Sequence, residues 1–298
     1  MRTNSKQTTP LASEYKVQEE QPLLPFLLQA VPKSRNAVKG ILSRGQVSVN
    51  GEPTTKHDRV LKAGDRVEIM TNQAAKNDSE LTGLSIMYED DSIIVIDKEA
   101  GLLSMAAKDK KETTAFSELS TYVKKANRSN RVYIVHRLDR ETSGVMLFAK
   151  TEEVKKLLQD NWEESVQERG YVALVEGKVR AETGEIVSWL RETRTFKVYS
   201  NPTDNGGQKA ITRYKRLQAS AQFSLLELSL ETGRKNQIRV HMEEIGHPVV
   251  GDKKYGATTN PIKRLGLHAV KLIIIHPITK EQHTFISDAP SAFYNKSK

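Results

Sequence analysis

From residue 84 almost to the C-terminus, apolar segments of strand length follow one another through short polar turns. The predicted strands occupy 91–98, 132–135, 144–149, 171–179, 211–217, 223–230, 267–275 and 283–286, with fewer helices at 115–125, 151–162 and 235–245. Strands joined directly by turns pair antiparallel, whereas a Rossmann fold alternates strands with helices. That alternation and its GxGxxG motif are missing. We therefore predict an α+β domain with a mixed, largely antiparallel sheet.

The length of 298 residues indicates two domains, since domains cluster near roughly 100–150 residues. Residues 1–20 are polar and unpatterned, which predicts a flexible tail. Residues 21–70 form a first small domain, and the polar segment 71–83 is interpreted as a linker. The second domain then extends over 84–298.

The first domain contains two predicted helices, at 23–31 and 35–44, followed by a hairpin. Gly45 closes the second helix, and the Asn-Gly pair in VSVNGEPTT is a strong hairpin signal. A further strand is predicted at 66–70. This order, with VSVNG and LKAGDRVEI, resembles the S4 RNA-binding domain, a small α+β unit. The resemblance implies RNA contacts by four basic residues, Lys33, Arg35, Lys39 and Arg44.

The charge of the chain supports a polyanionic partner. Lys and Arg exceed Asp and Glu by nine, 46 against 37. Between residues 33 and 66 there are eight basic and three acidic residues, so this block carries +5 of the +9. A solvated basic face is the plain alternative. Phosphate contacts from such a block give affinity and register with a steep salt dependence.

Composition excludes several classes of protein. The absence of cysteine rules out disulfides, thiolate catalysis and cysteine zinc sites. Apolar runs such as 93–96 and 272–275 are far shorter than the roughly 20 residues of a membrane span. The N-terminal residues lack the apolar region of a secretory signal. We expect a cytoplasmic protein that acts as a monomer and does not enter a membrane.

The densest cluster of chemically active side chains is VHRLDRETSGVMLFAK, residues 135–150. A strand enters a charged turn and another strand leaves it. Functional residues favour loops held between rigid elements, although a salt-bridged hairpin loop has the same composition. The segment HRLDRETSG is identified as the HRLDxxTSG signature of the RluA class of pseudouridine synthases. The resemblance covers about residues 84–290, and the S4-like region in front is seen in members that modify large-subunit ribosomal RNA.

The resemblance implies a pseudouridine synthase fold and three catalytic positions. Asp139 matches the catalytic aspartate of the family. Tyr171 in ERGYVALVEGKV matches the tyrosine that packs on the target base, and Arg239 in the segment 230–256 matches the arginine that pairs with the aspartate. The same segments imply RNA contacts by three further residues, Arg137, Arg140 and Gln237.

The sequence departs from the family pattern at two places. DKEAGLLSMAAK stands where the family has NKPxG and a loop with His and Pro, and Asn236 stands where His commonly precedes Gln237. These changes affect the predicted RNA-strand contacts and leave Asp139, Tyr171 and Arg239 intact.

The implied reaction requires no metal, nucleotide cofactor or energy source, so we expect neither a cofactor nor a metal. It requires an ionised carboxylate beside the ribose and base, and the guanidinium of Arg239 favours that ionised form. Asp139 can act covalently, or abstract the 2′ proton to give a glycal-like intermediate. Tyr171 offers an aromatic face and a hydroxyl close to the C5 proton. The second domain contains the histidines His136, His241, His247, His268 and His276, but no HExxH motif accompanies them.

The leading hypothesis is therefore an RNA pseudouridine synthase acting on 23S ribosomal RNA. A synthase directed at transfer RNA is an alternative with the same chemistry. A non-catalytic RNA-binding or ribosome-assembly protein is a second alternative, disfavoured by the intact HRLD, Tyr171 and Arg239. A hydrolase that uses Asp139 and the histidines is a third, and it lacks a nucleophile elbow or metal-ligand spacing.

Overall fold

The computed structural model describes residues 11–32, 35–43, 46–70, 81–106 and 112–298. The described residues form two compact units, one up to Leu81 together with 86–94, the other comprising 82–85 and 95–298. In the described part of the chain, no helix is both long and apolar enough to cross a membrane.

The first unit combines two helices with short strands. Its elements are β1 (Leu11–Lys16), β2 (Gln21–Pro22), α1 (Leu23–Ala30), α2 (Arg35–Ser43), β3 (Val47–Val49), β4 (Glu52–Thr54), β5 (Val60–Leu61) and β6 (Arg66–Met70). The main sheet has the order β1-β6-β3-β4, and β2 pairs with β5. Asn50 and Gly51 both have positive φ, the geometry that an Asn-Gly hairpin turn requires. The helices pack on the sheet through Leu27, Val38 and Val67, which are at most 1% exposed.

The predicted tail is wrong in its second half. Residues 11–16 form the edge strand β1, which pairs antiparallel with β6 in the register Lys16↔Arg66. Val17, directly after the strand, is 1% exposed in the core of this unit. LASEYK has no clear alternation of apolar residues, so its pairing depends on main-chain hydrogen bonds to β6 that no local pattern reveals.

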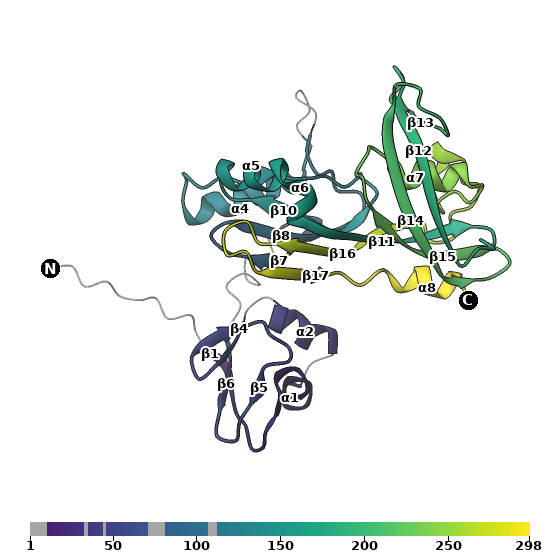
Figure 1. Ribbon diagram of the computed structural model, residues 1–298. Helices are drawn as coiled ribbons and strands as arrows, with labels where there is room; N and C mark the ends of the chain where they lie inside the picture. Colours follow the sequence, from purple (N-terminus) through teal and green to yellow (C-terminus); the bar gives the residue numbers. More distant parts are fainter. Residues whose placement is uncertain (1–10, 33–34, 44–45, 71–80, 107–111) are drawn as a thin grey trace. The chain divides into compact units, whose positions relative to one another are not determined.

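One large sheet runs through the second unit and also includes residues 86–94 (Figure 1). Its strands are β7 (Leu84–Glu89), β8 (Ile93–Lys98), β9 (Tyr133–Ile134), β10 (Ser143–Ala149), β11 (Val166–Glu176), β12 (Thr183–Glu192), β13 (Val198–Asn201), β14 (Gln208–Ala219), β15 (Phe223–Leu230), β16 (Leu267–Ile275) and β17 (Gln282–Ile286). Its helices are α4 (Ala115–Ala126), α5 (Glu152–Asp160), α6 (Trp162–Ser165), α7 (Gln237–Glu244) and α8 (Ser291–Lys296), with a short 3₁₀ turn at Lys253–Tyr255.

The strand order is β13-β12-β14-β15-β11-β16-β10-β8-β7, with β17 beside β16 and β9 beside β10. Pairs such as β11–β15 and β12–β14 are antiparallel, whereas β10 and β16 run parallel. The prediction of an α+β domain with a mixed, largely antiparallel sheet is thus confirmed. Helices α4, α5 and α6 lie over the β8–β10 end, and α7 packs beside β13 and β14 (Figure 1).

Several elements of this unit differ from the prediction, among them β7 and α8, which were not predicted. Strands β12 and β13 were not anticipated, because the inward positions of β12 include Ser188, which is completely buried yet polar. Its hydroxyl is paired with the ring of His241 at 2.9 Å. The helix predicted at 151–162 ends at Asp160, and a separate turn of helix, α6, begins at Trp162.

Gly144 joins the signature loop to β10 at the parallel pairing with β16. It has φ +111°, and a Cβ added here would overlap the carbonyl oxygen of Ala269 on β16. Only glycine fits this close approach. The final Gly of HRLDRETSG therefore lets the loop's exit strand lie directly against β16.

Candidate active site

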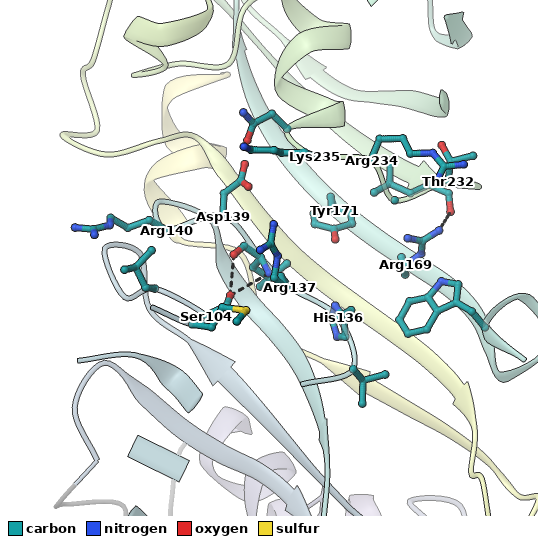
Figure 2. Close-up of a pocket in the computed structure, with 18 of the residues that line it drawn as sticks. Ser104, His136, Arg137, Asp139, Arg140, Arg169, Tyr171, Thr232, Arg234 and Lys235 are labelled. Atoms are coloured by element: carbon teal, nitrogen blue, oxygen red, sulfur yellow. Dashed lines mark hydrogen bonds between the residues drawn. The ribbon is translucent and has the colours of Figure 1, made fainter. Parts of the chain in front are cut away.

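The signature loop opens into a cavity of about 1080 Å³ in the second unit. Asp139 lies on the loop between β9 and β10, and Tyr171 projects from β11 toward the same space (Figure 2). The remaining walls come from segments 103–106, 135–140, 159–163 and 230–236. Residues more than 60 positions apart in the chain thus meet around one carboxylate and one aromatic ring.

The Asp139 loop is held by hydrogen bonds from Lys98 and Ser104, both in the segment DKEAGLLSMAAK that departs from the family pattern. Lys98 ends β8 with a side chain that is 1% exposed, and its ammonium donates to the carbonyl oxygens of Glu99, Leu102 and Arg140 at 2.8–3.1 Å. Ser104 donates to the carbonyl oxygen of Leu138 and accepts from its amide, at 2.7 and 3.1 Å. Both residues flanking Asp139 are therefore fixed, which limits where its carboxylate can point.

Arg239 reaches Asp139 from α7, 100 positions further along the chain. Its Nη1 donates to Asp139 Oδ2 at 3.1 Å. Its Nε and Nη2 donate to the two oxygens of Asp252, at 2.6 and 2.9 Å. Asp252 is buried, with 1% of its side chain exposed, against 28% for Asp139. The planar fork of Arg239 thus grips Asp252, and Asp139 receives a single hydrogen bond, from Nη1.

The approach of Arg239 depends on the turn before α7. Asn236 adopts the left-handed conformation at φ 55°, which asparagine tolerates better than most residues. Its amide donates to Tyr255 Oη at 2.9 Å, and its oxygen accepts from Arg239 Nη1 at 3.2 Å. Burial by itself lowers the pKa of Arg239, but the hydrogen bonds and charges of Asp252 and then Asp139 outweigh it and raise that pKa. Arg239 is a permanent cation here.

The phenol of Tyr171 faces Asp139 across the cavity (Figure 2). Burial raises the pKa of Tyr171, Arg169 partly offsets this effect, and the carboxylate of Asp139 adds to it. The hydroxyl is therefore neutral at physiological pH. A neutral phenol can stack against a base and relay a proton, but it is not a strong base in its resting state.

The three residues of the second domain predicted to contact RNA differ in their exposure to solvent. Arg137 is exposed and lines the cavity. Arg140 is also exposed at the cavity, where it forms an ion pair with Glu112 at 2.5 Å. The prediction for Gln237 is wrong. Its side chain is 3% exposed, and its amide bonds to Thr232, Arg234, Ile211 and Thr212, so it holds the turn before α7 and does not reach RNA.

The predicted contacts of the first domain fall mainly on α2. Arg35 and Lys39 are both exposed, and their spacing of four residues places them on the same side of the helix. Lys33 and Arg44 lie outside the described residues.

Several histidines of the second domain have structural partners. His136 accepts a hydrogen bond from the amide of Leu147 at 3.0 Å, and burial, aided by Arg169, lowers its pKa to about 4. His241 lies between Ser188 and Thr212, and burial lowers its pKa to about 4. Within the described residues, no group of three or more His, Asp or Glu is arranged to hold a metal ion. Neutral, engaged imidazoles do not favour the alternative of a histidine-based hydrolase.

Two site residues were missed by the sequence analysis, Lys98 and Asp252. Lys98 stands in the segment DKEAGLLSMAAK and Asp252 in the segment 230–256. The usable signal was a lysine shortly after the apolar run IIVI, at the end of a buried strand where a charge requires buried partners. Nothing in the chain around Asp252 identifies Arg239 as its partner.

Because the ammonium of Lys98 is buried, we expect the rate of the reaction to depend on pH. Burial lowers its pKa to about 8, although Glu141 and Asp139 favour its charge. Above that pH the neutral amine has two N–H groups for three carbonyl oxygens, so the Asp139 loop loosens and kcat falls as the pH rises. Lys98→Met should lower kcat by about 10- to 100-fold at pH 7 and remove this alkaline decline. The pH–rate profiles of wild type, Lys98→Met and the exposed control Lys124→Met measure the effect. A decline that persists unchanged in Lys98→Met would contradict it.

Comparison with known proteins gives one family. A profile described as RNA pseudouridylate synthase matches residues 92–244. An uncharacterized RNA pseudouridine synthase of Bacillus subtilis is 34% identical over 281 residues, covering 92% of this chain and 90% of the relative. Ribosomal large subunit pseudouridine synthase D of Neisseria meningitidis is 33% identical over 277 residues, covering 88% and 74% respectively.

A solved structure shows the same fold. Human RNA pseudouridylate synthase domain containing 4 superposes with a TM-score of 0.59 at 23% identity, covering 74% of this chain and 92% of that one. The sheet and the cavity over it therefore define a pseudouridine synthase fold. The chain belongs to the RNA pseudouridylate synthase family, and it is accordingly an isomerase whose substrate is RNA.

Proposed function

We propose that this protein isomerises specific uridines of large-subunit ribosomal RNA to pseudouridine, with Asp139 as the catalytic carboxylate. The observation that carries the proposal is the position of Asp139, whose carboxylate receives a hydrogen bond from Arg239 at 3.1 Å and opens onto a cavity shared with Tyr171. The reaction breaks the N1–C1′ bond, forms C5–C1′, removes the C5 proton and adds a proton at N1.

Each of the three side chains has a role that its surroundings support. Asp139, 28% exposed, can meet the ribose as a carboxylate paired with the permanent cation of Arg239. Attack by its carboxylate and abstraction of the 2′ proton both start from that ionised form. Tyr171 offers its ring to a uracil extruded from the RNA and its neutral hydroxyl to the C5 proton.

The ribosomal substrate is the finer part of the proposal. It is supported by the similarity to a relative named for the large ribosomal subunit and by the S4-like order of α1, α2 and the β3–β4 hairpin. Arg35 and Lys39 on α2 supply cations for phosphate contacts. We further propose a first domain of residues 11–70, which adds β1 and Val17 to the predicted 21–70, and a second domain of residues 84–298. We also propose a monomer working in the cytoplasm, since one chain carries Asp139, Tyr171 and Arg239.

Tritium release tests activity and substrate together. Transcripts of 23S ribosomal RNA and of the transfer RNA set, labelled with tritium at uridine C5, are incubated with the protein, and pseudouridines are mapped in a strain lacking the gene. We expect release from the ribosomal transcript and loss of sites there. Tritium release from transfer RNA alone would show that the substrate is transfer RNA and not ribosomal RNA. Binding to both RNAs without release from either would favour the non-catalytic alternative.

A further inference from the structure

The turn between β12 and β13 displays an aromatic side chain to solvent. Phe196 is 70% exposed, the highest value among the large hydrophobic side chains that the structure describes. Its backbone is left-handed at φ 58°, an outlier for a bulky residue. Hydrogen bonds from Phe196 N to Thr193 O and from Thr193 N to Lys197 O, both 2.9 Å, hold this conformation. The turn therefore holds the Phe196 ring in solvent and outside a hydrophobic core.

Cations surround this ring. Lys254 Nζ donates to the carbonyl oxygen of Phe196 at 2.8 Å, and Lys235 Nζ lies 5.6 Å from the centre of its ring. Lys197 lies 5.1 Å from the ring of Tyr199, which is itself 49% exposed. We call these side chains the Phe196 surface, together with the exposed Arg194 of the same turn.

The Phe196 surface keeps a positive charge. Lys235 is paired with Glu192, and Lys197 with Glu243 at 3.6 Å. Among the described residues, no carboxylate lies within ion-pair distance of Arg194 or Lys254. Two cations therefore remain uncompensated beside two exposed aromatic rings. An aromatic face next to free cations fits a nucleic acid strand, because every base has a face that can stack and every nucleotide carries a phosphate.

The surface is continuous with the catalytic cavity through Lys235. This lysine lines the cavity beside Arg234 (Figure 2). Its ammonium lies 5.6 Å from the centre of the Phe196 ring. An RNA strand whose uridine occupies the cavity can therefore place a neighbouring nucleotide on the ring.

We propose that Phe196 is a stacking platform for an unpaired base that flanks the target uridine, with Arg194 and Lys254 contacting the adjacent phosphates. The proposal rests on the proposed function insofar as RNA occupies the cavity. Stacking on an aromatic side chain accepts any base, so the platform adds affinity and registers the strand without selecting the sequence. If the Phe196 surface bound a protein instead, substitution of Phe196 would not change the affinity for RNA.

Binding of a 23S ribosomal RNA fragment that contains a mapped target site tests the platform. Phe196→Ala should raise Kd and KM by about tenfold and leave kcat nearly unchanged. Phe196→Asn, which suits the left-handed backbone, should give the same loss, and Phe196→Trp should retain wild-type affinity. The matched control Ile278→Ala removes a side chain that is 55% exposed on the β16–β17 turn and should change nothing. Arg194→Gln should reduce the slope of log K against log salt by about 0.7.

A fluorescent base locates the stacked nucleotide. With 2-aminopurine placed next to the target uridine, we expect quenching by wild type and none by Phe196→Ala. Equal Kd values for wild type, Phe196→Ala and Phe196→Asn would overturn the platform, even with normal tritium release from the fragment. A wild type that binds the fragment and quenches the probe but releases no tritium would overturn the proposed function and leave the platform standing.

Discussion

Asp139→Asn should abolish isomerisation and leave the fold and RNA binding intact. The amide is nearly isosteric with the carboxylate, and its oxygen can still accept the hydrogen bond from Arg239 Nη1. It carries no charge, so it can neither attack the ribose nor take the 2′ proton. Loss of a nucleophile or general base typically costs about 10³-fold or more in kcat. Tritium release from C5-labelled ribosomal RNA measures this loss.

The control for this substitution is Asp160→Asn. Asp160 is exposed at the end of α5 and does not line the cavity. It should keep wild-type turnover, and both variants should have the same thermal unfolding curve as wild type. Turnover of Asp139→Asn within about tenfold of wild type would be too fast for a missing catalytic carboxylate and would refute its assignment.

Arg239→Leu should remove both activity and a large part of the folding stability. The substitution leaves Asp252, only 1% exposed, without the two hydrogen bonds that its carboxylate receives. Removing one partner of a buried ion pair typically costs about 3–5 kcal/mol. Asp139 loses the hydrogen bond from Nη1 and its neighbouring cation at the same time, so its carboxylate is no longer held and activity falls. Chemical denaturation and tritium release measure the two effects.

A double substitution separates the structural from the catalytic effect of Arg239. In Arg239→Leu/Asp252→Asn the buried side chain is neutral, so much of the lost stability should return. Activity should stay low, because Asp139 still lacks its cation. Arg239→Lys keeps the charge but cannot reproduce the planar fork on Asp252, so an intermediate rate is expected. If the double variant regained both stability and full activity, Asp139 would not depend on the guanidinium.

Much of the fold was accessible from the sequence because it rests on local patterns. The bounds of β15 and β16 are the predicted ones, since both strands are rich in apolar residues and are bounded by polar turns. The Asn-Gly pair predicted the β3–β4 hairpin for a steric reason, as both residues adopt positive φ. Strands β1 and β12 were not predicted, because polar residues occupy positions whose burial or pairing depends on a neighbouring strand.

For the candidate site, the sequence by itself determined which side chains to consider, and only the tertiary structure decided what each one contacts. The signature marked Asp139, and matching segments marked Tyr171 and Arg239, because motif spacing is local and survives in a single chain. That Arg239 grips Asp252 and gives one hydrogen bond to Asp139, that Gln237 is buried, and that Lys98 supports the Asp139 loop were all decided by packing. The physical reason is that a guanidinium or ammonium binds whichever oxygens the fold brings within about 3 Å, and contacts across 42 or 100 residues depend on the sheet that joins them.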